Sequence, residues 1–128
     1  EKNLPNCMFL PFQSDEMFPY SLSAADLGVV ILDEKTSKGS VPSKSYNLMS
    51  YGIPSLYIAS KDSQLAVYAD RYRHAHLFTK QEISKVATWV EEVSQDQQKQ
   101  NELSKNALQA ALHFKRNNAD KFVDKYLY

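Results

Sequence analysis

The hydrophobic positions of the chain form four short runs that are separated by longer amphipathic segments. These runs, at residues 8–10, 27–32, 55–59 and 75–78, predict short β-strands because turn-forming or polar residues bound them. The run at 27–32, Leu-Gly-Val-Val-Ile-Leu, shows no alternation of apolar and polar residues. A parallel strand buried on both faces has this pattern, so we expect it at the centre of a sheet.

Helical spacing and capping signals predict a helix after each of the first two strands. Ser14 is a suitable N-cap for the first helix, and Pro42 suits the first position of the second. Gly52 is expected to end the second helix, since glycine adopts the left-handed conformation that closes helices. The stripe expected to be buried on the first helix consists of Phe18, Leu22 and Ala25.

The second half of the chain predicts three further helical regions. An irregular helix is expected at 62–73, and Thr79 with Glu82 three residues later forms a capping-box pattern before the next helix. The very polar segment 95–100 predicts a turn, and residues 101–128 predict the closing helices. The whole pattern indicates an α/β fold with a parallel sheet flanked by helices.

Composition narrows the class of protein. Lysine plus arginine and aspartate plus glutamate each number 15 in 128 residues, and this zero net charge argues against a nucleic-acid binder. Cys7 is the single cysteine and is expected to be a small core residue. No apolar run approaches the roughly 18 residues of a membrane span and no export signal is visible, so we expect a cytoplasmic location. Only three glycines are present, and no glycine-rich phosphate loop occurs.

Candidate chemistry is expected in the loops that follow the strands, where parallel sheets bind ligands. The loops at 11–14 and 33–44 qualify, and the second leads into a helix N-terminus whose free N–H groups favour anions. Ser43 and Lys44 in the first helical turn would add a hydroxyl and a positive charge, which predicts a phosphate or sugar-phosphate site. The alternative is that the serine and proline only cap the helix and that Lys44 is solvated.

Three other patterns are weaker. His74 and His76 would share one face of a strand, but no further ligand is near, so surface histidines are favoured over a metal pair. The Arg-Tyr-Arg-His run at 71–74 interleaves cations with an aromatic ring, which we attribute to a helix end or to contact with another domain. Asp33 and Glu34 follow a strand, as the acids of phospho-receiver domains do, but those domains also need a lysine beyond a later strand.

A family resemblance covers nearly the whole chain. The stretch 23–32, Ser-Ala-Ala-Asp-Leu-Gly-Val-Val-Ile-Leu, and the stretch 40–54, Ser-Val-Pro-Ser-Lys-Ser-Tyr-Asn-Leu-Met-Ser-Tyr-Gly-Ile-Pro, carry it. They resemble the nucleotide-sugar domain of glycosyltransferases built from two Rossmann-like domains, the group-one or family-four type of the GT-B fold. Members with the proline-serine-lysine variant often build bacterial surface polysaccharides.

The resemblance implies a site and a reaction. By this resemblance, residues 1–128 would be a single, truncated, partial Rossmann-like domain. The chain would be the donor-binding, C-terminal half of a transferase that moves a sugar from a nucleotide sugar to a glycan or lipid-linked acceptor. Phe12 and Gln13 would lie near the base of the nucleotide. The donor's diphosphate and sugar would be held by Lys38, Gly39, Ser40, Val41, Pro42, Ser43, Lys44 and Asn47.

The sequence departs from the family pattern at two positions. The usual pair of glutamates, eight positions apart, is replaced by Gly39 and Asn47. Asn47 retains an amide that can bond to a ribose hydroxyl, whereas Gly39 offers only backbone. The catalytic base is implied to lie in an acceptor domain outside this sequence, so we assign no catalytic residue, metal or cofactor here and expect no transfer by this chain alone.

The partners follow from the same interpretation. We expect a nucleotide-sugar donor, the acceptor domain, no nucleic acid, and membrane association only through that other domain. The four predicted strands would be strands 3 to 6 of a doubly wound sheet, which leaves unpaired edges. The chain is therefore expected either to pair an edge with a second copy or to rearrange residues 8–10. The alternative function is a non-catalytic α/β module that binds a phosphorylated ligand or a protein partner.

Overall fold

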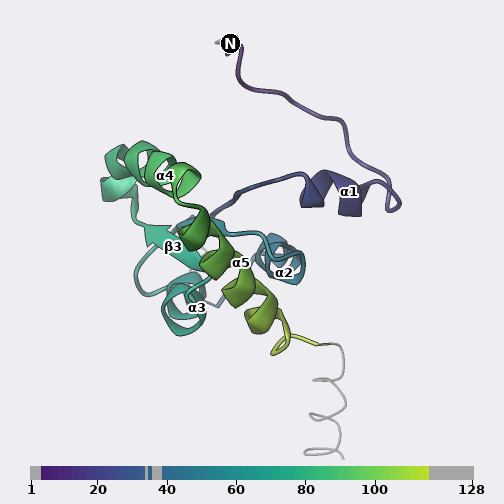
Figure 1. Ribbon diagram of the computed structural model, residues 1–128. Helices are drawn as coiled ribbons and strands as arrows, with labels where there is room; N and C mark the ends of the chain where they lie inside the picture. Colours follow the sequence, from purple (N-terminus) through teal and green to yellow (C-terminus); the bar gives the residue numbers. More distant parts are fainter. Residues whose placement is uncertain (1–3, 34, 36–38, 116–128) are drawn as a thin grey trace, which may run out of the picture.

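Strands and helices alternate along the chain as the periodicity predicts. A computed structural model describes residues 4–33, 35 and 39–115, and Figure 1 shows helices on both faces of a small sheet. The element bounds are α1 Phe18–Ser23, β1 Gly28–Ile31, α2 Ser43–Ser50, β2 Ser55–Ile58, α3 Gln64–Tyr72, β3 Ala75–Phe78, a 3₁₀ helix η1 Lys80–Lys85, α4 Val86–Gln95 and α5 Gln97–Ala111.

The sheet consists of three parallel strands in the order β1-β2-β3. Gly28 pairs with Ser55, and Ser55 pairs with Ala75, so the three strands are in step along their whole length. The α/β class, the parallel sheet and three of the four predicted strands are confirmed. This architecture is consistent with a partial Rossmann-like fold, in which each strand is followed by a helix that returns the chain to the other end of the sheet.

The prediction of a buried strand at residues 8–10 is wrong. Met8, Phe9 and Leu10 are 82%, 98% and 63% exposed and pair with no strand among the described residues. Three apolar residues gain strand geometry only from a neighbouring strand, because an isolated extended segment has no ladder of hydrogen bonds. Cys7 in the same segment is exposed, so its predicted place in the core is also wrong.

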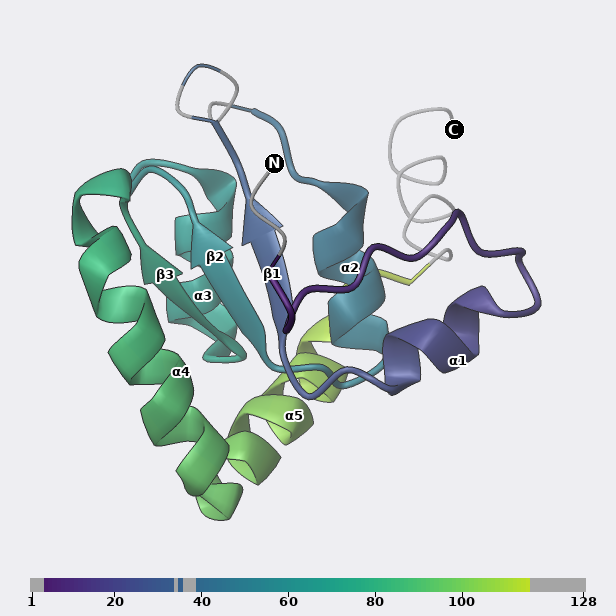
Figure 2. The same cartoon turned by 90° about the horizontal axis from the view of Figure 1, so that it is seen from above.

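The prediction that β1 is buried on both faces is wrong as well. Val30 is 3% exposed, whereas Val29 and Ile31 on the opposite face are 43% and 67% exposed. On that face α4 packs Trp89 and Val93 against β2 and β3 and leaves β1 uncovered (Figure 2). The sequence of β1 has the continuous apolar pattern of a central strand, but β1 lies at an edge of the described sheet. Pairing of this edge with a second copy stays a prediction, for which light scattering is the test.

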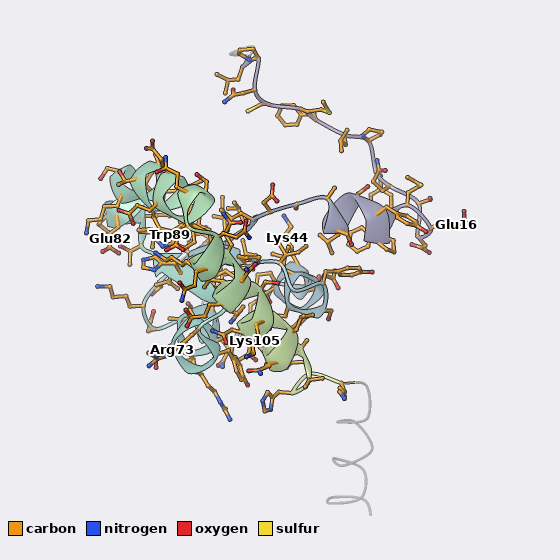
Figure 3. All side chains as sticks on the ribbon, in the orientation of Figure 1. Glu16, Lys44, Arg73, Glu82, Trp89 and Lys105 are labelled. Atoms are coloured by element: carbon orange, nitrogen blue, oxygen red, sulfur yellow. The ribbon has the colours of Figure 1, made fainter. Side chains whose placement is uncertain are left out.

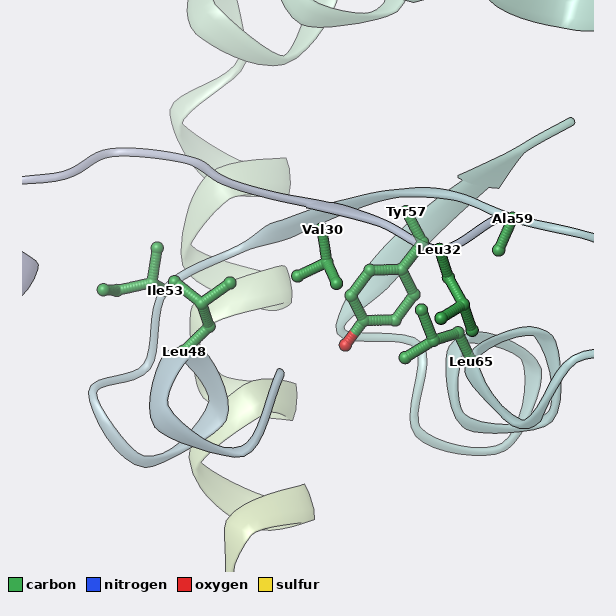
Figure 4. Packing of buried hydrophobic residues seen from close by; sticks show 7 residues of the cluster. All are labelled: Val30, Leu32, Leu48, Ile53, Tyr57, Ala59 and Leu65. Atoms are coloured by element: carbon green, nitrogen blue, oxygen red, sulfur yellow. The ribbon is translucent and has the colours of Figure 1, made fainter. Parts of the chain in front are cut away.

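The main core lies on the face that α2 and α3 cover. Figure 4 shows Val30 and Tyr57 of the sheet directed toward Leu48 of α2 and Leu65 of α3. Gly28 lets α2 approach β1 closely, because a Cβ at this position would overlap the Leu48 side chain. Gly52, with a φ of 65°, ends the turn after α2 as predicted. These contacts fix α2 relative to the sheet.

The C-terminal half confirms one capping prediction and corrects a loop. The Glu82 carboxylate accepts hydrogen bonds from the backbone N–H of Thr79 at 3.1 Å and from its hydroxyl at 3.0 Å, which completes the capping box. The turn predicted at 95–100 is reduced to Asp96, whose carboxylate caps α5 by accepting from the Lys99 N–H at 2.9 Å. One N-cap therefore suffices to start a new helix in this polar segment. Of the closing helices predicted over 101–128, α5 is described, and residues 116–128 lie outside the described part.

His74 is a buried residue, which corrects its prediction as a surface histidine. Its side chain is 0% exposed, and its Nε2 lies 2.7 Å from the hydroxyl oxygen of Tyr57 in the core. Nδ1 is buried without a hydrogen-bond partner. Burial lowers the pKa of His74 to about 4 and raises the pKa of Tyr57. Both groups are therefore uncharged in the folded protein at neutral pH.

The one-sided burial of β1 predicts unequal costs for two substitutions on this strand. Val30→Ala is expected to lower the free energy of unfolding by about 2 kcal/mol, because it opens a cavity in the core. Ile31→Ala is expected to change it by less than about 0.5 kcal/mol, since this side chain is exposed. Urea denaturation of both variants at a concentration where the chain is monomeric measures the difference. Equal losses would show that both faces of β1 are covered.

Burial of His74 predicts a loss of stability in mild acid. The unfolded chain binds a proton near pH 6.5, but folded His74 resists it down to about pH 4, so protonation favours unfolding between these values. The free energy of unfolding is expected to fall by up to about 3 kcal/mol across this range from this residue. His74→Gln, which keeps a partner for Tyr57 but does not titrate, should flatten the profile relative to the control His76→Gln. Parallel profiles for the two variants would contradict the prediction.

Candidate functional site

The amino end of α2 lies at the edge of the sheet where the parallel strands end. After β1 the chain leaves this edge in a loop, and α2 then runs back beside the sheet (Figure 2). This is the edge at which open α/β sheets bind their ligands. The packing of Leu48 and Met49, which are 2% and 0% exposed, holds α2 in this position.

The first turn of α2 leaves backbone donors open. Pro42 occupies the N-cap position in an extended conformation and has no side-chain oxygen to cap the helix. Its carbonyl accepts from the Ser45 N–H at 2.9 Å and from the Ser45 hydroxyl at 2.7 Å. The N–H groups of Ser43 and Lys44 have no hydrogen-bond partner among the described residues. Such donors at the positive end of a helix dipole favour an anion.

Three residues predicted to bind the donor lie together on one wall of a cavity. Ser43, Lys44 and Asn47 occupy positions i, i+1 and i+4 of α2 and line a cavity of about 290 Å³ (Lys44 is labelled in Figure 3). They contribute a hydroxyl, an ammonium group and an amide, which together can bind a charged group and a neighbouring hydroxyl. The helical spacing that unites them is visible in the sequence.

The opposite wall of this cavity is apolar, and the sequence analysis gave these residues a different role. Phe18, Leu22 and Ala25 were expected to form a buried stripe, but Phe18 is 41% exposed and all three line the cavity together with Val29. Only Leu22 also packs against the core of the sheet. The sequence therefore showed that these residues form an apolar stripe. That the stripe faces α2 across a cavity depends on the tertiary structure and was not predicted.

The loop before α2 contributes differently at each predicted position. Gly39 has a φ of 86°, a conformation that suits glycine, and with Ser40 it is exposed. Val41 is half-buried and packs against the core, so its side chain anchors the loop. Pro42 is the N-cap of α2. Lys38 lies outside the described residues.

Phe12 and Gln13 are not joined to this site by any hydrogen bond or ring contact that the structure describes. Phe12 is 101% exposed, and the Gln13 side chain bonds to the Pro11 carbonyl at 2.7 Å and to the Ser21 hydroxyl at 3.4 Å. These bonds associate the segment with α1. Its proximity to a nucleotide base stays a prediction.

An ion pair crosses the same edge of the sheet. The Lys80 ammonium, just after β3, lies 3.7 Å from the carboxylate of Asp33, just after β1. This supplies the lysine that the phospho-receiver alternative requires, but both side chains are more than half exposed, at 56% and 59%. An exposed ion pair of this kind contributes little to the stability of the fold. Glu34, the second acid of that pattern, lies outside the described residues.

The two histidines lie in different surroundings. His74 is buried against Tyr57, whereas His76 is exposed and stacks on Trp89 with ring centroids 5.2 Å apart. Burial and the Lys99 ammonium lower the pKa of His76. In the described part of the chain, no three histidine, cysteine or acidic side chains gather as metal ligands would.

Comparisons with known proteins add no family to this geometry. The chain matches no protein-family model, no curated protein and no solved structure. Among the described residues, no helix has both the length and the apolarity to cross a membrane. The structure itself shows an α/β chain with a parallel sheet. It also shows that Ser43, Lys44 and Asn47, in the first turns of α2, line a cavity.

Proposed function

We propose that this chain is the donor-binding portion of a GT-B glycosyltransferase that acts in cell-surface polysaccharide synthesis. The proposal combines the resemblance of residues 23–54 to that family with the open amino end of α2. A nucleotide sugar would place its diphosphate there, and the acceptor and the catalytic base would come from another domain. The α/β architecture agrees with this proposal.

The observation that carries the proposal is the grouping of hydrogen-bond donors at the start of α2. The N–H groups of Ser43 and Lys44 and the side chains of Ser43, Lys44 and Asn47 surround the start of α2. A diphosphate needs several preorganised donors and a nearby cation, which bind it without large rearrangement. The same groups would stabilise the charge that grows on the leaving nucleoside diphosphate as the bond to the sugar breaks.

The cavity beside α2 gives the rest of the donor a place. Asn47 lies one turn along α2 from Ser43, so its amide is positioned to bond to a hydroxyl next to the phosphates. The wall formed by Phe18 and Leu22 offers apolar surface to a ring. Gly39 would contribute only its backbone in the place of the family's glutamate.

The proposal predicts that one lysine dominates the binding of a nucleoside diphosphate. Lys44→Ala should weaken binding at least about ten-fold, because it removes a charge-assisted contact at the cavity. Lys38→Ala and Lys105→Ala should each change it less than about three-fold; the second is a control at an exposed position of α5. Isothermal titration of the chain with a panel of uridine, guanosine, adenosine and thymidine diphosphates measures this.

Equal losses in the three lysine variants would mean that the phosphates have been placed wrongly. Saturable binding of nucleoside diphosphates, with none of simple sugar phosphates, would favour the transferase over the non-catalytic module. Binding of phosphorylated ligands without regard to the nucleoside would favour the module. Transfer of sugar by the chain alone would refute the assignment of the catalytic base to another domain.

A further inference from the structure

A second cavity lies at the opposite edge of the sheet from the open end of α2. It has a volume of about 290 Å³ and is formed where α3 ends and α5 passes it. Arg71, Tyr72 and Arg73 line it from the α3 side, and Asn106 and His113 line it from α5 and the turn that follows. Because α3 runs back before β3, its end lies at the amino edge of the strands. This cavity is therefore separate from the proposed donor site.

The described residues that line this cavity carry positive charge. Two guanidinium groups line it, and no carboxylate does so within the described part of the chain. No described acidic residue forms an ion pair with Arg71 or Arg73. The chain as a whole has zero net charge, so two arginines on one concave surface form a local excess of positive charge. One arginine would be enough to interact with the end of α3.

The backbone at Arg73 is unusual. Arg73 has a φ of 52°, and it is the one residue other than glycine with a positive φ in the described part of the chain. Glycine adopts this helix-ending conformation with less strain than a residue with a side chain. The Asn106 amide donates a hydrogen bond to the Arg73 carbonyl at 3.0 Å, which ties this strained turn to α5. The chain thus has a long cationic side chain at the cavity, in a position where glycine would form the same turn with less strain.

Ring contacts order the other side of the cavity. The Tyr72 ring stacks on His113 with centroids 5.4 Å apart and an interplanar angle of 30°. The Arg71 guanidinium carbon lies 5.4 Å from the centre of the Tyr72 ring. A guanidinium held against a ring keeps its N–H groups available at its edge and loses less freedom when it binds an anion.

We propose that this cavity binds a phosphate monoester group. Guanidinium groups pair with phosphate through two parallel N–H···O bonds, which distinguishes this anion from a simple point charge. The cavity, with a volume of about 290 Å³, is large enough for the phosphate monoester of a small molecule. The proposal does not depend on the proposed function, because it uses no residue of α2.

Titration of the chain with inorganic phosphate, followed by ¹H–¹⁵N NMR spectra, tests this site. We expect saturable shifts at the amides of Tyr72, Arg73 and Asn106. Arg73→Gly should weaken this binding at least about ten-fold through loss of the charged contact. The same variant should keep or raise the melting temperature, since glycine relieves the strain at this turn. The control Lys105→Ala, at an exposed position of α5 outside the cavity, should change the affinity less than about two-fold.

The outcomes separate this site from the donor site. Shifts at Ser43 that Lys44→Ala abolishes belong to the donor site and leave this proposal to be judged on Arg73 alone. Shifts at Arg73 that do not saturate, or that are the same in Arg73→Gly, would overturn it. Glycerol 3-phosphate that reproduces the shifts indicates a free ligand. Binding to phosphatidic acid vesicles, lost in Arg73→Gly and absent for phosphatidylcholine vesicles, would instead indicate a lipid headgroup as the source of the phosphate.

Discussion

The packing of α2 against β1 is the constraint on which the rest of the structure depends. Because Gly28 has no side chain, Leu48 fits directly over the strand, and the neighbouring Met49 is fully buried. This contact directs the amino end of α2 toward the carboxyl edge of the sheet, where the N–H groups of Ser43 and Lys44 have no partner among the residues that the structure describes. A shift of α2 by one turn, about 5.4 Å, would move Lys44 and Asn47 relative to the other residues that line the cavity.

The local features of the fold followed from the sequence, whereas the features that depend on neighbours did not. The bounds of α2 were predicted because Pro42 and Gly52 act through their own backbone preferences. The capping box at Thr79 was predicted for the same reason. The exposure of residues 8–10 and of Ile31 was not, because burial of an apolar run requires a second element to cover it. His74 shows the converse, since a polar residue entered the core through its bond to Tyr57.

The candidate site shows the same division. The grouping of Ser43, Lys44 and Asn47 follows from helical spacing and was predictable, but the apolar wall opposite them was not, because α1 is distant from α2 in sequence. The cavity at Arg73 is formed by the ends of α3 and α5, which only the tertiary structure brings together. The chain thus has surfaces rich in hydrogen-bond donors at both edges of its sheet. One lies at the start of α2 and the other at the end of α3.

The central claim is that the amino end of α2 receives the diphosphate of a nucleotide, and amide NMR shifts measure this most directly. With a nucleoside diphosphate added, the largest shifts are predicted at the backbone amides of Ser43 and Lys44, and the matching nucleoside without phosphates should not produce them. Shifts that are confined to other elements, or that the nucleoside alone reproduces, would contradict the claim.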